Sequence, residues 1–231
     1  MLPGDVALRG GFAGHEDAAS ERVAGNKSSL SGDIQHADVA TDNCFHVLRS
    51  SGPGYYTLDA LEVCDGQAEA PAPVANGAGF LGEDGIALTV TDCLFRDHSA
   101  AGDGGHIWLG DECALVIVDT RLEGGGAGQD GGAFRAGNWG RIAHDVQADI
   151  TLQNVEIANI QAAGDGGAFR AGNWGHVVAT GLTIEGATAG GSGGAFRAGN
   201  WGRVTGSDWQ ISDTTAATNG GLAAFDEDAF I

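Results

Sequence analysis

The decapeptide GGAFRAGNWG occurs at residues 131–140, 166–175 and 193–202 of this chain. The first two copies start 35 residues apart (131 to 166) and the last two start 27 apart (166 to 193). Weaker copies continue the 27-residue register as GGHIW at 104–108, GAGF at 77–80 and GGLA at 220–223. Recurrence at one spacing indicates a repeat architecture, in which each unit buries its apolar side only against its neighbours.

The segments between the glycine pairs align in the same register. They read LTVTDCLF, LVIVDTRL, ITLQNVEI, VVATGLTI and VTGSDWQI. One column of this alignment contains Phe95, Leu122, Ile157, Ile184 and Ile211, and the column two residues earlier contains Cys93, Thr120, Val155, Leu182 and Trp209. An apolar period of two is typical of strands and not of helices.

Short strands in a unit of about 27 residues, with Gly-rich corners, predict one rung of a parallel β-solenoid. We expect one domain over residues 1–231, with opening rungs in 1–76 and regular rungs in 77–231. The longer unit has an insertion of 8 residues (35 minus 27) near 141–152, which should form an outward loop. The amphipathic helices of α/β folds are not visible, and a β-sandwich would not produce a fixed 27-residue repeat.

Several motifs resemble those of polymorphic outer-membrane proteins. The run FRDHSA at 95–100 followed by Gly104 and Gly105, together with GGAF in each decapeptide, is similar to the FxxN and GGAI repeats of that family. The stretches 8–14, 30–34 and 42–47 look like the opening rungs of such proteins. The resemblance implies a right-handed, pectin-lyase-like, single-stranded β-helix on a bacterial surface. His98 stands where the FxxN asparagine would be.

The charge of the chain excludes some partners. Asp and Glu number 31 against 11 Lys and Arg, a formal net charge of −20. Such a surface repels nucleic acid, and no apolar run is long enough for a membrane-spanning helix. The N-terminus MLPGDVALRGG shows no signal peptide, whereas the family resemblance implies an extracellular or cell-surface location. The four cysteines, Cys44, Cys64, Cys93 and Cys113, allow two disulfides or four free thiols.

Basic and aromatic residues gather in one predicted stripe. Five of the ten arginines and three of the five tryptophans lie in or directly after the decapeptides. In register order they form an arginine column, a tryptophan column and a second basic column: Arg135, Arg170 and Arg197; Trp139, Trp174 and Trp201; Arg141, His176 and Arg203. Because Phe134 and Ala136 belong to apolar columns, the arginine between them should point outward.

Three interpretations of this stripe compete. Arginine could stack on tryptophan by cation–π contact and stabilise the rungs. The stripe could dock another protein or further copies of this chain. It could also bind an acidic polysaccharide, with tryptophan on the sugar rings and arginine on the carboxylates. Ice binding favours flat, Thr-rich arrays and fits this bulky, charged stripe poorly.

A carboxylate column precedes the glycine pairs. Asp103, Asp130 and Asp165 lie in it, followed by Ser192 and Asn219. Stacked carboxylates are weak candidates for Ca²⁺ ligands, and the sequence predicts no other cofactor. These residue types fit the tight turn before Gly-Gly better, because they bond their own backbone and tolerate the left-handed conformation. The column of Asp92, Asp119, Asn154 and Asp208 should contain turn residues at strand ends.

No catalytic residues are predicted. An active site in a repeat protein should contain residues that break the repeat pattern, whereas the unusual residues of this chain all follow the repeat. His106 and His176 are in different columns, which favours packing or solvation over catalysis. We expect a non-catalytic scaffold or adhesin. The alternative is a polysaccharide lyase or glycoside hydrolase of the pectin-lyase-like group, since this architecture carries enzymes and adhesins alike.

Overall fold

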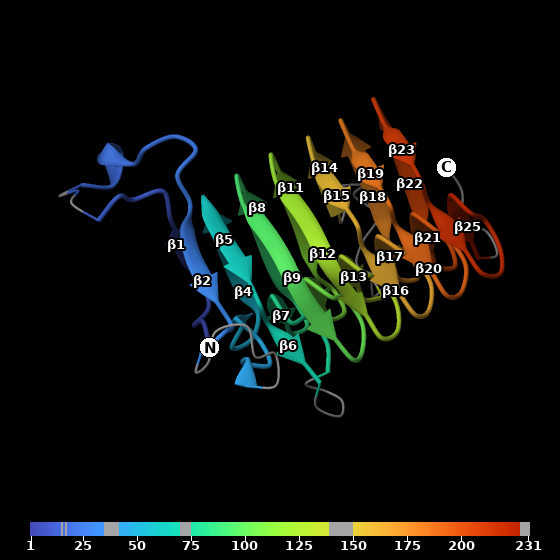
Figure 1. The fold of residues 1–231 in the computed structure, drawn as a ribbon, viewed down its shortest axis with the longest axis horizontal. Helices are drawn as coiled ribbons and strands as arrows, with labels where there is room; N and C mark the ends of the chain where they lie inside the picture. The colour runs from blue at the N-terminus through green and yellow to red at the C-terminus, as the bar shows by residue number, and fades with distance from the viewer. Residues whose placement is uncertain (15, 17, 35–41, 70–74, 139–149, 227–231) are drawn as a thin grey trace.

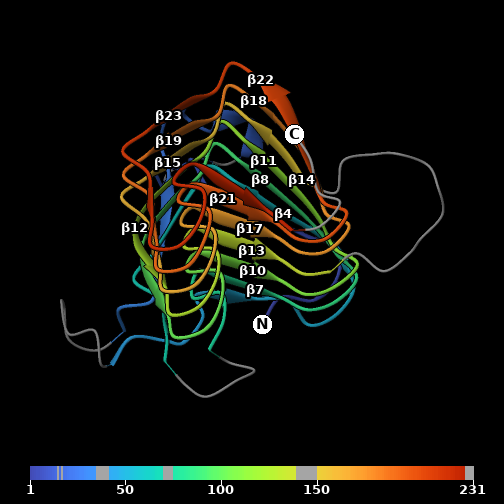
Figure 2. The same ribbon diagram turned by 90° about the vertical axis from the view of Figure 1, so that its right-hand side faces the viewer.

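The protein consists of parallel β-strands in three long sheets (Figures 1 and 2). The structure is a computed structural model and describes residues 1–231 apart from 15, 17, 35–41, 70–74, 139–149 and 227–231. Its described residues contain one 3₁₀ turn, η1 (Ala19–Glu21), and no α-helix. No helix among them is long and apolar enough to cross a membrane.

We number the three sheets 1, 2 and 3 in the order in which the chain enters them. Sheets 1 and 3 each consist of seven parallel strands. Sheet 1 contains β1 (Val6–Arg9), β4 (Gly54–Asp59), β8 (Ile86–Thr91), β11 (Ala114–Val118), β14 (Ile150–Gln153), β18 (His176–Thr180) and β22 (Arg203–Ser207). Sheet 3 contains β3 (Leu48–Arg49), β7 (Phe80–Gly82), β10 (Ile107–Leu109), β13 (Phe134–Ala136), β17 (Phe169–Ala171), β21 (Phe196–Ala198) and β25 (Ala223–Phe225).

Sheet 2 has eleven strands, because short strands extend its main series. The main series is β2 (Ser28–Ser31), β5 (Leu61–Cys64), β9 (Leu94–Ala100), β12 (Arg121–Ala127), β15 (Glu156–Ala158), β19 (Thr183–Glu185) and β23 (Gln210–Ser212). The short strands are β6 (Gln67–Ala68), β16 (Gln161–Ala162), β20 (Thr188–Ala189) and β24 (Thr215–Ala216).

The chain passes through sheets 1, 2 and 3 in turn and then repeats the cycle. Phe134 pairs with Ile107 of the preceding repeat and with Phe169 of the following one, and Phe169 pairs with Phe196. This confirms an all-β, solenoid-like arrangement. Of the insertion expected near 141–152, residues 141–149 lie outside the described part of the chain, and Ile150 to Leu152 belong to β14.

The turn between sheet 1 and sheet 2 uses a left-handed residue in most repeats. Asp92, Asp119, Asn154 and Asp208 have φ of 49°, 48°, 51° and 57°, and Gly181 takes the same position with φ 66°. Asp, Asn and Gly tolerate this conformation better than other residues do. The predicted column of strand-end turn residues is therefore confirmed.

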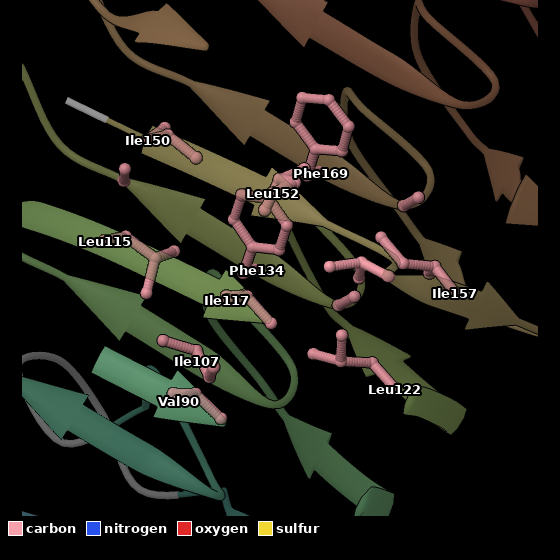
Figure 3. Close-up of a cluster of buried hydrophobic side chains, with 14 of the residues drawn as sticks. Val90, Ile107, Leu115, Ile117, Leu122, Phe134, Ile150, Leu152, Ile157 and Phe169 are labelled. Carbon is pink, nitrogen blue, oxygen red and sulfur yellow. The ribbon is translucent and has the colours of Figure 1, made fainter. Parts of the chain in front are cut away.

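The core lies between the three sheets and contains ladders of identical or similar side chains (Figure 3). The rings of Phe134 and Phe169 stack with centroids 4.9 Å apart and planes 2° apart, and Phe196 continues the stack at 5.0 Å. Leu115 and Ile117 of sheet 1 and Leu122 of sheet 2 point into the same space. Parallel strands in register place equivalent residues one strand spacing apart, which allows such ladders.

Candidate interaction surface

The predicted arginine column lies on the outer side of sheet 3. In each FRA strand the phenylalanine and alanine are buried and the arginine is half-buried, so Arg135, Arg170 and Arg197 point away from the core. Their backbones pair directly, Arg135 with Arg170 and Arg170 with Arg197. The column continues as Trp108 in β10.

Each of these arginines is neutralised by an aspartate of the preceding repeat. Arg135 Nε lies 3.3 Å from Asp103 Oδ2, and Arg170 Nη1 lies 3.0 Å from Asp130 Oδ2. The third pair joins Arg197 Nη1 to Asp165 Oδ2. The arginine column and the aspartate column, which the sequence suggested as two separate features, are therefore one ladder of ion pairs. This ladder offsets the repulsion between stacked guanidinium groups.

The second oxygen of each carboxylate accepts a backbone hydrogen bond from the next repeat. Asp130 N donates to Asp103 Oδ1 at 3.0 Å, Asp165 N donates to Asp130 Oδ1 at 2.7 Å, and Ser192 N donates to Asp165 Oδ1 at 2.7 Å. Both oxygens of each weak Ca²⁺ candidate are thus engaged within the protein. Among the described residues, no group of three or more His, Cys, Asp or Glu is placed to hold a metal ion.

A pair of substitutions at Asp165 separates the two roles of this column. Asp165→Asn keeps an oxygen for Ser192 N but loses the charge facing Arg197, and should lower the free energy of unfolding by at most about 1 kcal/mol, as for partly exposed ion pairs. Asp165→Ala also removes the acceptor and should cost about 1–3 kcal/mol. Urea denaturation checks this order. An asparagine variant as unstable as the alanine variant would show that the ion pair, and not the backbone bond, dominates.

The tryptophan column lies in the turn that leads from sheet 3 to sheet 1. Trp174 and Trp201 are 51% and 52% exposed, and their indole rings stack with centroids 5.3 Å apart and planes 10° apart. Trp174 N donates to Asn200 O of the next repeat. Trp139 and Arg141 lie outside the described residues. The sequence-predicted tryptophans that the structure describes therefore come together on the surface.

The backbone conformation at these tryptophans is unusual for a bulky residue. Trp174 and Trp201 have φ of 65° and 60°, in the left-handed region. The equivalent positions of earlier repeats are Gly85, with φ 72°, and Glu112, with φ 58°. The turn therefore accepts a glycine or a glutamate, and glycine would fit it with less strain. The fold does not require an indole at this position.

Among the described residues, Arg170 and Arg197 do not stack on tryptophan by cation–π contact. The cation–π contact found in the described part of the chain joins Arg22 to Phe12, with the guanidinium carbon 5.9 Å from the ring centroid. Arg170 and Arg197 instead reach back to the carboxylates of the preceding repeat. The indoles stack on each other because one turn places them at the same position in successive repeats.

His176 and Arg203 are the first residues of β18 and β22, and their backbones pair. His176 is half-buried and Arg203 is exposed. They lie two residues after Trp174 and Trp201 but belong to sheet 1, whereas the arginine column belongs to sheet 3. The single stripe expected from the sequence is therefore divided between two sheets and the turn that joins them.

Sequence reasoning missed a buried histidine pair. His98 and His106 are both fully buried, and their Nδ1 atoms lie 2.7 Å apart. Neither Nε2 atom has a hydrogen-bond partner. Burial lowers the pKa of His106 to about 3, and burial together with the charges of His106 and Arg96 lowers the pKa of His98 well below its ordinary value. In the sequence the two histidines are eight residues apart, and no helical or strand period predicts that they contact each other.

All four cysteines are free thiols in the structure, so the open choice between disulfides and thiols is resolved for this state. Cys64, Cys93 and Cys113 are buried, and burial raises the pKa of Cys93 and of Cys113 to about 11. The thiolate is the reactive form of cysteine. These two side chains therefore behave as small apolar core residues.

The geometry defines an all-β protein of parallel, solenoid-like sheets with a pair of stacked tryptophans on equivalent turns of two successive repeats. No protein-family model, curated protein or solved structure matches this chain.

Proposed function

We propose that the chain is a right-handed, single-stranded parallel β-helix with rungs of about 27 residues that acts as a non-catalytic binding scaffold outside a bacterial cell. The cyclic order of the three sheets and the 27-residue register of most repeats support this architecture. The contact surface that we propose is the Trp174–Trp201 pair.

The observation that carries this proposal is the placement of two half-exposed indoles on a left-handed turn that does not need them. Strained residues at the surface are characteristic of functional sites. A tryptophan buries 150–250 Å² when fully covered, so covering the exposed half of one indole contributes about 2–3 kcal/mol. That magnitude is typical of the anchor residues of protein interfaces.

A protein partner fits this surface better than an acidic polysaccharide does. Arg135, Arg170 and Arg197 are already paired with carboxylates, and their side chains are only 17%, 20% and 23% exposed. Recognition of uronic acids would require breaking these pairs. A row of stacked indoles instead offers apolar area for a partner's aliphatic or aromatic side chains.

The double variant Trp174→Gly with Trp201→Gly tests the contact. Glycine suits the left-handed turn, so circular dichroism and melting should stay close to those of the unchanged chain. Binding of the labelled chain to intact cells of the source organism should weaken at least tenfold. Protease treatment of the cells should abolish binding, and added polyuronate should not compete.

Glu112→Gly is the matched control, because it changes the same position of an earlier repeat without removing an indole; it should bind like the unchanged chain. Binding that survives protease and is competed by polyuronate would replace the protein partner with an acidic glycan. If the partner is a second copy of this chain, sedimentation velocity should show a dimer or larger oligomer of the purified protein. Release of unsaturated or reducing ends from polyuronate would contradict the non-catalytic part of the proposal and favour the lyase or hydrolase alternative.

A further inference from the structure

The outer side of sheet 1 carries an array of small uncharged side chains. Toward the C-terminal end of each of β8, β11, β14, β18 and β22, two alternate residues point away from the core, and their backbones pair from strand to strand. These residues, which we call the threonine–valine patch, are Thr89, Thr91, Val116, Val118, Thr151, Gln153, Val178, Thr180, Thr205 and Ser207. All of them are half-buried or exposed.

The absence of charge distinguishes this patch from the outer sides of the other two sheets. On sheet 2, Arg96 pairs with Glu62 at 2.6 Å, and Arg121 pairs with Glu156 at 2.5 Å. On sheet 3, the outer side carries the arginine–aspartate ladder. For a chain with a net charge of −20, ten adjacent outward residues without a charge are a marked exception, and the charged outward residue on these five strands is Arg203 at the start of β22.

The side chains of the patch are held in a regular two-dimensional array. Paired strands lie about 4.8 Å apart, and alternate residues along one strand lie about 6.6 Å apart. Threonine and valine are branched at Cβ, which restricts χ1 and fixes the direction of their methyl and hydroxyl groups. Figure 1 shows β8, β11 and β14 running side by side at similar angles. The array therefore repeats with little variation from strand to strand.

The hydroxyl groups of the patch are available to solvent. Of its threonines, all of which the structure describes, Thr205 has a hydrogen bond within the protein, from Oγ1 to Val177 O at 3.5 Å. The other threonine hydroxyls have no such partner. Water over the patch meets methyl and hydroxyl groups in fixed positions, and none of the ten residues beneath it carries a charge.

We propose that the threonine–valine patch binds ice. Ice presents a regular lattice of water oxygens. A rigid, periodic, uncharged array can order the water above it in a similar lattice, and this ordered water can then join the ice crystal. A second copy of this chain fits the patch less well, because each copy brings a net charge of −20. Charged residues border the array and limit its extent: Asp59 and Arg203 on β4 and β22, and the turn residues Asp92, Asp119 and Asp208 at the strand ends.

Thermal hysteresis and inhibition of ice recrystallisation by the purified chain test this proposal directly. The unchanged chain should show both activities. Thr151→Tyr places a bulky ring at the centre of the array and should lose most of both activities. Thr183→Tyr is the matched control, because Thr183 is a half-buried outward residue on β19 of sheet 2; it should keep them. The double glycine variant of Trp174 and Trp201 should also keep them, which separates this proposal from the contact proposed above.

Circular dichroism and melting must show that each variant is folded, and Thr89→Tyr replaces Thr151→Tyr if that variant is not. The proposal is overturned if the unchanged chain has neither activity, or if Thr151→Tyr and Thr183→Tyr behave alike. It is also overturned if sedimentation velocity shows a dimer that Thr151→Tyr dissociates and no ice activity is found, since the patch would then join two copies.

Discussion

Replacing Phe169 with alanine should lower the free energy of unfolding by about 3–5 kcal/mol. The ring is fully buried and stacks between Phe134 and Phe196, at centroid distances of 4.9 and 5.0 Å. Its removal takes apolar area from both neighbours and leaves a cavity that a repeated core cannot easily close, because the strands on either side are paired in register. For a chain of this length the melting temperature should fall on the order of 10 °C.

Leu222→Ala is the control for this prediction. Leu222 is 48% exposed and precedes β25, so its truncation should change stability by no more than about 0.5 kcal/mol. Urea denaturation of both variants measures the difference. A loss below about 1 kcal/mol for Phe169→Ala would mean that the phenylalanine stack contributes little to the core.

Lowering the pH from 7 to 5 should destabilise the protein through His98 and His106. The pKa of both side chains is lowered by burial in the folded state, whereas an unfolded histidine titrates near pH 6.5. The unfolded state therefore binds protons first as the pH falls. The stability that the neutral pair contributes is fully present above about pH 6.5 and is lost as the pH falls toward about 3, the pKa of His106. Between pH 7 and pH 5 the loss is about 2 kcal/mol for each histidine that stays neutral.

The double variant His98→Ala with His106→Ala isolates this effect from the many carboxylates, which titrate in both proteins. Alanine occupies the corresponding inward positions in a later repeat, as Ala187 and Ala195, so the fold accommodates it. Urea denaturation at pH 7, 6 and 5 should show a smaller loss of stability in this variant. His176→Ala, which removes a half-buried surface histidine, should keep the steeper dependence. Equal pH dependence in the double variant and the unchanged chain would refute the linkage.

The repeated column of Phe95, Leu122, Ile157, Ile184 and Ile211 was predictable from sequence because a period of two and a fixed register leave few arrangements for buried side chains. The structure pairs all five residues in that order. The same logic placed Phe134 and Ala136 in the core and Arg135 outside it. These are properties of the local alternation of residues and of the repeat length.

The candidate site was harder to predict, because a register gives the column of a residue and not the partner of its side chain. Arg170 was expected beside Trp174 but pairs with Asp130 of the preceding repeat. The threonine–valine patch was overlooked because its members are unremarkable singly, and only strand pairing makes them an array.

The sequence by itself therefore determined the repeat, the strands, the apolar residues that face inward and the turn positions, since each follows from spacing along one chain. The tertiary structure alone decided which charges neutralise each other, that His98 and His106 share a hydrogen bond, and that the tryptophans stack in a left-handed turn. The reason is geometric: these features depend on how side chains reach between repeats and around corners, and such distances are set only when the sheets pack.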